Sequence, residues 1–181
     1  MNRGIVLFDR AAIRRMLTRI AHEILEKNRG TDDLVVLGIP RGGEMVAVEL
    51  AKVLEDIEKV PIPCGSLDIT LYRDDLGWRT IRPLHKTEMP VSPENGRVVL
   101  VDDVFFTGRT VRAALDALMD LGRPRTIQLA VLIDRGHREL PIRPDYVGRD
   151  IPTARDEDIC VDFDENGLAN AVRLIKPLKE Q

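Results

Sequence analysis

The chain has 181 residues, of which 31% are charged and 44% are hydrophobic, with a formal net charge of −3. This length suits one globular domain, residues 1–181, with a single core. No stretch approaches the roughly 18 consecutive apolar residues of a membrane helix, and the N-terminus lacks a signal-peptide pattern. The two cysteines, Cys64 and Cys160, have no CxxC or Cys/His spacing. We therefore expect a reduced, cytoplasmic setting and no membrane partner.

Charge is unevenly distributed along the chain. Residues 9–29 carry six Lys/Arg against three acids, residues 135–149 carry four Arg against two acids, and residues 150–165 carry seven acids against one Arg. A weakly acidic total argues against non-specific coating of nucleic acid. The two basic segments can still hold one specific anionic partner, although solvated protein faces remain the alternative interpretation.

The first predicted element is a helix that begins after Asp9, a candidate N-cap, and ends before Gly30. Its apolar residues recur at the spacing of one buried helical face: Ile13, Met16, Leu17, Ile20, Ala21, Ile24 and Leu25. Polar and basic residues occupy the opposite face: Arg14, Arg15, Thr18, Arg19 and His22.

Strands and helices then alternate. Apolar runs predict strands at 34–39, 62–71, 98–101 and 126–133, and amphipathic segments predict helices at 45–54 and 109–121, with short apolar runs at 159–163 and 172–175. This order is typical of an α/β fold with a parallel sheet covered by helices on both sides. Residues 72–97 have no periodicity, and connections of this length are commonly lids or hairpins over a site.

Two carboxylates end the strand predicted at 98–101. In parallel α/β sheets, ligands bind where strands end and loops lead into helices. Asp102 and Asp103 can accept hydrogen bonds from a diol such as that of a ribose. The Thr-Gly-Arg-Thr segment at 107–110 follows at a helix start, where free N–H groups and the helix dipole favour a phosphate. The loop therefore suits a ribose 5-phosphate, and Gly108 allows close backbone approach.

The same residues allow two other interpretations. A strand that ends in Asp-Asp also suits the metal-binding strand of P-loop nucleotidases, but the chain contains no GxxxxGK[ST] segment. A GxGxxG dinucleotide fingerprint is also absent from the sequence. An acidic strand end beside an ordinary capped helix remains the purely structural alternative.

Residues 98–110 resemble the phosphoribosyl pyrophosphate (PRPP) motif of type I phosphoribosyltransferases: four apolar residues, two acids, a short spacer and a Thr-Gly-x-Thr loop. Further segments narrow the resemblance to the PyrR family of bifunctional pyrimidine operon attenuators and uracil phosphoribosyltransferases: residues 12–15, 17–23, 68–76 and 134–143. The likeness extends over about residues 5–165. It implies the type I phosphoribosyltransferase fold, a parallel central sheet flanked by helices with a small irregular hood at 134–158.

The resemblance implies conversion of uracil and PRPP to UMP and pyrophosphate, with Mg²⁺ held mainly through PRPP and no direct metal ligand from the protein. The implied catalytic residues are Asp102, Asp103, Arg41, Tyr72 and Arg73, with 72–97 as the flexible active-site loop. The implied PRPP- and UMP-binding residues are Pro40, Arg41, Asp102, Asp103, Val104, Phe105, Phe106, Thr107, Gly108, Arg109, Thr110 and Arg135.

One position indicates the base. Many purine-specific relatives have an Asp just before the Thr-Gly of the phosphate loop, where it meets a ring nitrogen of the purine. This chain has Phe106 there, so a pyrimidine fits better. The base is expected near Asp134 and Arg135. The resemblance also implies a pyrophosphate loop at residues 40–43, where Arg41 supplies charge and the glycines expose N–H groups. This loop departs from the family, because Pro40 stands where relatives often have Thr.

The resemblance also implies binding of a stem-loop in the pyrimidine leader mRNA, dependent on UMP or UTP. The residues expected to contact this RNA are Thr18, His22, His137, Arg138, Arg143 and Arg149. Because aromatic residues make up 4% of the chain, binding would depend on phosphate contacts and hairpin shape. A homodimer or homotetramer is expected. The alternative function is a phosphoribosyltransferase for another base, without an RNA-binding role.

Overall fold

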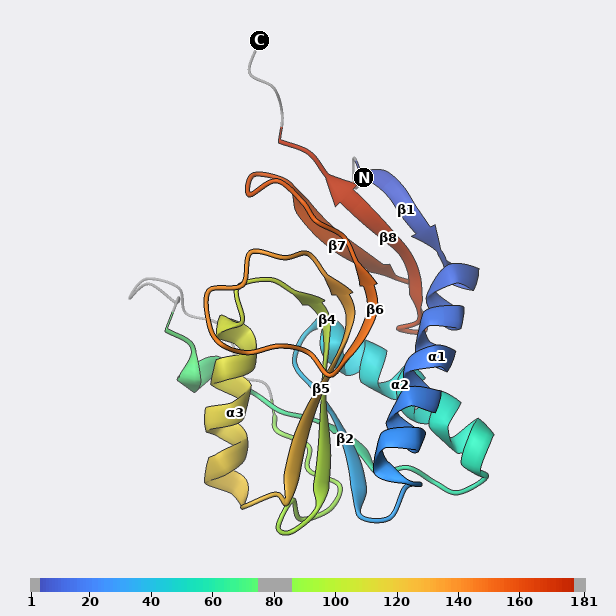
Figure 1. The fold of residues 1–181 in the computed structure, drawn as a ribbon, viewed down its shortest axis with the longest axis vertical. Helices are drawn as coiled ribbons and strands as arrows, with labels where there is room; N and C mark the ends of the chain where they lie inside the picture. The colour runs from blue at the N-terminus through green and yellow to red at the C-terminus, as the bar shows by residue number, and fades with distance from the viewer. Residues whose placement is uncertain (1–3, 75–85, 178–181) are drawn as a thin grey trace.

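The computed structural model describes residues 4–74 and 86–177, so part of the expected 72–97 loop lies outside the described residues. A central sheet of five strands lies between α3 on one side and α1 and α2 on the other (Figure 1). No helix in the described ranges is long and apolar enough to cross a membrane. The elements are β1 (Ile5–Asp9), α1 (Arg10–Asn28), β2 (Leu34–Gly38), α2 (Gly42–Glu58), β3 (Cys64–Ser66), the 3₁₀ turn η1 (Thr70–Tyr72), β4 (Arg97–Phe105), α3 (Arg109–Leu121), β5 (Thr126–Asp134), β6 (Tyr146–Asp150), β7 (Asp158–Phe163) and β8 (Ala169–Ile175).

The central sheet is parallel throughout, with strand order β3-β2-β4-β5-β6. Alternate residues of β4 face opposite sides: Val99 and Val101 pack with α1 and α2, whereas Val98 and Leu100 pack with α3. Because both faces are covered, the strand is apolar at every one of these positions. The predicted α/β sheet with helices on both sides is confirmed.

Helix α1 follows the prediction closely. Asp9 is its N-cap, and its side chain accepts a hydrogen bond from the Ala12 N–H at 2.8 Å. All seven residues of the predicted apolar face are buried. The C-cap is Arg29, which adopts the left-handed conformation with φ of 56°, one residue before the predicted stop at Gly30.

Three elements differ from expectation. The strand expected over 62–71 is only three residues long, and η1 follows it. The segment expected to form an irregular hood contains β6, which joins the central sheet beside β5. A Cβ at Gly148 in β6 would overlap the Leu132 carbonyl, so this strand packs unusually closely. Its five residues, two of them charged, give no periodicity that a sequence reading could detect.

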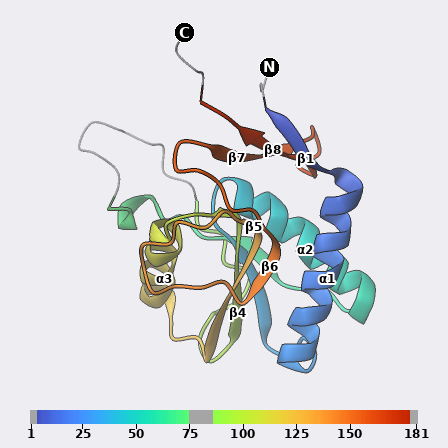
Figure 2. The same cartoon turned by 45° about the horizontal axis from the view of Figure 1, so that its top comes forward.

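The third difference is a second, antiparallel sheet in the order β1-β8-β7. Figure 2 shows this sheet lying across the top of the molecule, above α1 and α2. Ile159, Val161 and Val172 extend the α1–α2 core into it. The N-terminal strand β1 was not predicted, because Ile5 and Val6 are about half exposed and pair with a strand more than 160 residues away.

The α1 cap gives a direct test of this fold. We expect Asp9→Ala to lower the free energy of unfolding by about 1 kcal/mol, because the Ala12 N–H loses its acceptor. Asp9→Asn keeps an acceptor oxygen and should leave stability nearly unchanged. Urea unfolding of the three proteins measures the difference, and equal stability of Asp9→Ala and wild type would contradict the capping role.

Candidate functional site

Two loops meet at the carboxyl edge of the central sheet. Strands β2 and β4 are neighbours, with Gly38 opposite Val101, and the Ile39 N–H donates to the Val101 carbonyl at 2.8 Å. The turn at 40–43 therefore lies beside Asp102, as expected for adjacent parallel strand ends. The two loops that the sequence singled out form one site.

Two glycines allow this close approach. A Cβ at Gly42 would overlap the carboxylate of Asp103, and a Cβ at Gly43 would overlap the Val101 carbonyl. Helix α2 begins at Gly42 without a side-chain cap, and the peptide bond between Pro40 and Arg41 is cis. The free N–H groups of this helix start thus lie next to the acid pair, with exposed Arg41 alongside.

The two carboxylates differ in environment. Asp102 is buried, with 6% of its surface exposed, whereas Asp103 is half-buried. The Asp103 N–H donates to Asp102 Oδ1 at 3.0 Å, and the Val104 N–H donates to Asp103 Oδ1 at 2.9 Å. Burial and then the negative charge of Asp103 raise the pKa of Asp102 well above its usual value, while the positive charge of Arg73 opposes the rise.

A cavity of about 130 Å³ lies at the start of α3. Gly108 occupies the left-handed region with φ of 92°, and no side chain caps the helix. Apart from the Arg109 N–H, which donates to the Thr107 hydroxyl at 3.4 Å, the amides of the first turn are therefore open to an anion. The residues that line the cavity are Arg73, Asp102, Val104, Phe105, Phe106, Thr107, Gly108, Arg109, Thr110 and Val111.

Tyr72 and Arg73, adjacent in sequence, take different positions. Arg73 lines the cavity, and its Nη1 lies 3.5 Å from the Thr110 hydroxyl. The Tyr72 hydroxyl instead donates to Asp120 of α3 at 2.7 Å, a bond that raises the pKa of Tyr72. Its carbonyl accepts from Arg112 at 2.9 Å. Tyr72 thus holds the start of the 72–97 segment on α3 and does not line this cavity.

The hood is tied to the phosphate loop by backbone bonds. The Arg135 N–H donates to the Phe105 carbonyl at 3.0 Å, and the Glu139 N–H donates to the Thr107 carbonyl at 3.0 Å. The Arg109 side chain adds an ion pair with Glu139 at 3.1 Å. Residues 135–139 therefore follow the course of the loop that would bind a nucleotide.

Arg135 is buried, and its side chain points into the hood. Its Nε donates to the Thr153 hydroxyl at 3.2 Å and its Nη1 to Asp158 at 2.6 Å, while Nη2 donates to the Glu157 carbonyl. Thr153 and Asp158, which accept hydrogen bonds from Arg135, were not predicted from the sequence. The strongly acidic 150–165 segment was the available signal, because a buried arginine needs carboxylate or carbonyl acceptors.

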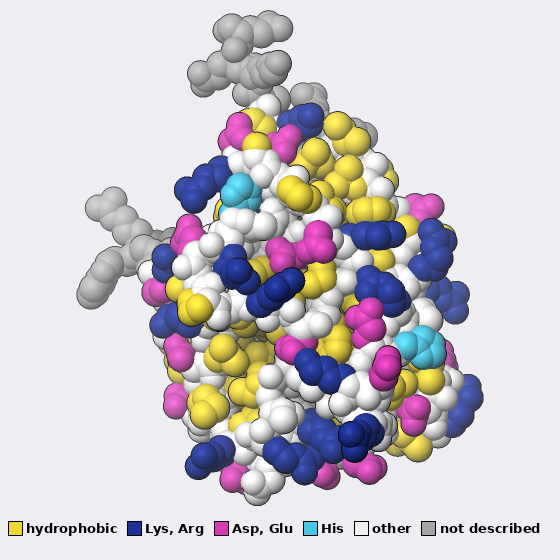
Figure 3. Space-filling view, in the orientation of Figure 1, with side chains coloured by type: hydrophobic (Ala, Val, Ile, Leu, Met, Phe, Trp, Pro, Cys, Tyr) yellow, Lys and Arg dark blue, Asp and Glu magenta, His cyan; other side chains and the backbone are white. Residues whose placement is uncertain are grey.

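The basic face of α1 lines a separate, open cavity of about 550 Å³, formed by Ala11, Arg14, Arg15, Thr18, Arg19 and His22. Arg19 donates to the carbonyls of Val147 and Gly148 in β6. This contact places the α1 face beside β6, which ends near exposed Arg149. Figure 3 shows basic side chains, with acidic ones among them, spread over this face.

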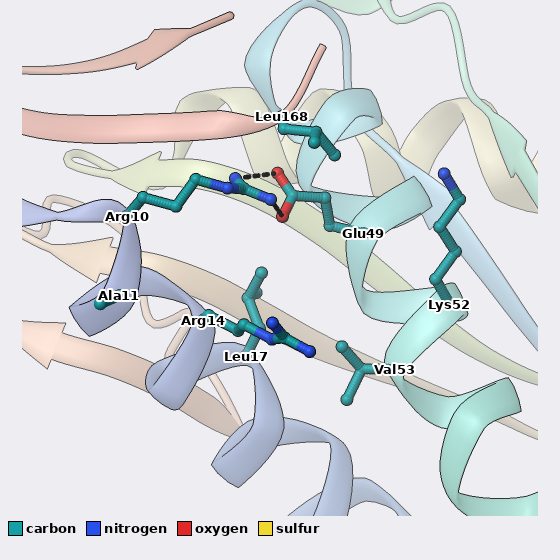
Figure 4. Close-up of a pocket in the computed structure, with 8 residues that line it drawn as sticks. All are labelled: Arg10, Ala11, Arg14, Leu17, Glu49, Lys52, Val53 and Leu168. Atoms are coloured by element: carbon teal, nitrogen blue, oxygen red, sulfur yellow. Dashed lines mark hydrogen bonds and ion pairs between the residues drawn. The ribbon is translucent and has the colours of Figure 1, made fainter. Parts of the chain in front are cut away.

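A second cavity, of about 510 Å³, lies between α1 and α2 (Figure 4). Its Arg10 is paired with buried Glu49 at 3.2 Å, and Glu49 also accepts from the Ala169 N–H. Arg14 and Lys52 line the same cavity. Since Arg14 lines both cavities, the basic surface of α1 continues towards α2, while Arg10 is committed to an internal ion pair.

The remaining residues of the predicted RNA-binding set lie in the hood. Arg138 and Arg143 are exposed. His137 is only partly exposed, and its Nε2 lies 2.6 Å from the Thr153 carbonyl. The structure therefore brings Thr18, His22 and Arg149 to neighbouring elements but places His137 within the hood.

The chain is similar to known proteins over most of its length. A family model of the phosphoribosyl transferase domain matches residues 7–166. The bifunctional protein PyrR of Geobacter sp. (strain M21) is 59% identical over 172 residues, which cover 94% of this chain and 97% of that protein. The corresponding protein of Enterococcus faecalis (strain ATCC 47077 / OG1RF) is 52% identical over 168 residues, which cover 93% and 94%. The chain belongs to the PyrR family.

Solved structures show how widely the fold of this PyrR family member occurs. The hypoxanthine phosphoribosyltransferase of Trypanosoma cruzi has a TM-score of 0.71 at 23% identity, over 95% of this chain and 96% of that one. The Staphylococcus aureus enzyme of the same name has a TM-score of 0.70 at 21% identity, over 96% and 93%. These likenesses confirm the predicted phosphoribosyltransferase fold.

The buried acid gives a test of the site's electrostatics. Because the folded protein raises the pKa of Asp102, the unfolded chain loses this proton at lower pH, and stability falls as pH rises through that interval. We expect Asp102→Asn to raise the free energy of unfolding more at pH 7 than at pH 4. Denaturant unfolding at both pH values measures this, and an equal gain, or a larger gain at pH 4, would contradict the assignment.

Proposed function

We propose that this protein transfers the phosphoribosyl group of PRPP to uracil, giving UMP and pyrophosphate. The observation that carries the proposal is a carboxylate pair near the end of β4, followed by a short loop and an open helix start, and packed against a second, glycine-rich helix start. This arrangement offers acceptors for ribose hydroxyls between two sites for anions. Membership of the PyrR family supports the same activity.

Each part of the site has a role in this reaction. Amides of residues 107–110 bind the 5-phosphate, and Asp102 and Asp103 accept hydrogen bonds from the ribose hydroxyls. Arg41 and the amides at the start of α2 hold the pyrophosphate as its bond to the anomeric carbon breaks. The uracil nitrogen forms the new bond to the anomeric carbon, and its proton passes to an oxygen of the leaving pyrophosphate. Holding both reactants in place lowers the entropy cost of bringing them together. The negative charge of the carboxylate pair stabilises the positive charge that develops on the sugar in the transition state.

The site fits Mg²⁺ only in partnership with PRPP. Carboxylate oxygens suit this hard ion, and Asp102 and Asp103 are the residues that would face it. Within residues 4–74 and 86–177, however, no group of three His, Cys, Asp or Glu could enclose a metal. The ion would therefore be held mainly by the diphosphate, where its charge stabilises the leaving pyrophosphate.

The base preference follows from Phe106. A phenyl ring lines the cavity at the position where purine-specific relatives have an acid, so a purine finds no partner for its ring nitrogen. An apolar wall still accepts the edge or face of uracil. A pyrimidine is therefore the favoured acceptor.

An assay with a panel of bases tests this function. Supplied with PRPP and Mg²⁺, the protein should convert uracil faster than hypoxanthine, because Phe106 offers no partner to a purine; orotate, a pyrimidine with a carboxylate, completes the panel. Product nucleotide is measured by chromatography, and omission of PRPP is the control. Absence of UMP, or faster conversion of hypoxanthine, would contradict the proposal.

A second function, RNA-binding regulation, is favoured by the basic face of α1 and its contact with β6. We propose that Thr18, His22, Arg138, Arg143 and Arg149 contact a stem-loop of pyrimidine leader mRNA in the cytoplasm, under control of UMP or UTP. A ligand in the nucleotide site changes RNA affinity only by binding two protein states unequally. One such face is small, so a homodimer or homotetramer presents it in several copies.

Two arginines at opposite ends of the sheet provide a matched test. Arg149→Gln should weaken hairpin binding by about 3- to 10-fold and lower the salt dependence by about one phosphate contact. Arg123→Gln, an exposed arginine before β5, should change neither, and both variants should make UMP normally. Equal effects of the two substitutions, or equal affinity of the wild type for a scrambled hairpin, would contradict specific RNA recognition.

A further inference from the structure

The ring of Phe106 is held between two side chains of the hood. The guanidinium carbon of Arg135 lies 4.1 Å from the Phe106 ring centroid. The ring of His137 approaches from another direction, with centroids 5.7 Å apart and planes at 76°, an edge-to-face arrangement. Phe106 itself lines the nucleotide cavity, so both contacts act on a wall of the site.

Arg135 is not free to bind a ligand with its N–H groups. Only 5% of its surface is exposed, and its donors are directed at Thr153, Asp158 and the Glu157 carbonyl. These partners fix the plane of the guanidinium group. Arg135 therefore acts on the site through its guanidinium group, which packs against the Phe106 ring.

His137 is fixed by the same hood residue. Its Nε2 lies 2.6 Å from the Thr153 carbonyl, and since a carbonyl only accepts, Nε2 carries a proton and donates. Its backbone is also specialised, with a positive φ of 62°. Thr153 thus binds Arg135 through its hydroxyl and His137 through its backbone carbonyl, which links the two side chains that contact Phe106.

We infer that Arg135 and His137 are positioning residues that fix the Phe106 ring as the wall of the base subsite. The inference rests on the proposed function, which places the base beside Phe106. A fixed ring selects a base by shape, whereas a loosened ring has several orientations and binds the base less well. This assigns His137 a role in base binding, in place of the RNA contact expected from sequence.

A double-mutant cycle on uracil affinity tests the inference. His137→Asn removes the ring while keeping a residue that tolerates positive φ, and Phe106→Leu removes the aromatic wall. His137→Asn should raise KM for uracil by about 3- to 10-fold and change KM for PRPP less than about 2-fold. In the Phe106→Leu background, His137→Asn should have no further effect on KM for uracil, because its target is gone.

Arg135 needs a different substitution, because its loss would leave Asp158 without its partner. Arg135→Lys keeps the positive charge and removes the flat face, and it should raise KM for uracil without raising KM for PRPP. His22→Ala is the control from the basic face, with normal kinetics for both substrates. Hairpin affinity, measured alongside, should fall for His22→Ala and stay unchanged for His137→Asn.

Two outcomes would overturn the inference: additive effects of His137→Asn and Phe106→Leu, or a loss of hairpin affinity in His137→Asn with an unchanged KM for uracil. The cycle is run with whichever base the wild type uses fastest. Failure to use uracil would therefore contradict the proposed function, while the coupling between His137 and Phe106 is still decided by the cycle.

Discussion

The pairing of β2 with β4 is the constraint on which the site depends. It sets the start of α2 against Asp102 and Asp103 so tightly that a Cβ at Gly42 would overlap a carboxylate. One strand pairing thus brings together the helix start at Gly42, the carboxylates of Asp102 and Asp103 and, one loop further, the helix start at Arg109. The parallel core, apolar on both faces, holds these loops in place. The same burial that makes the site rigid raises the pKa of Asp102. The ionised form of this residue therefore lowers the stability of the folded protein.

The hood completes the site through contacts that differ in kind. Backbone bonds from Arg135 and Glu139 hold it to the phosphate loop, and side chains around Phe106 form the wall next to them. Arg138 and Arg143 of the same hood segment are exposed to solvent. Because the Arg135 and Glu139 N–H groups bond to the Phe105 and Thr107 carbonyls, a displacement of this loop would also displace the start of the hood.

Much of this arrangement could be predicted from local sequence. The α1 face, the buried strands and the two loops were readable because periodicity and strand ends are local signals. Strand β6 was not, since its burial comes from Tyr146 and Gly148 packing on β5 and not from an apolar pattern. Nor was the β1-β8-β7 sheet, which pairs the two ends of the chain. The separation of Tyr72 from Arg73, and the fixation of Arg135 by Thr153 and Asp158, are tertiary contacts for which no short-range pattern exists.

We propose that the end of β4 and the loop after it bind the sugar and the phosphate of one nucleotide. A crystal structure with UMP tests it most directly. We expect the phosphate on the amides of residues 107–110 and the two ribose hydroxyls on Asp102 and Asp103. A structure with this loop empty and UMP bound at another place, such as the cavity between α1 and α2, would contradict it.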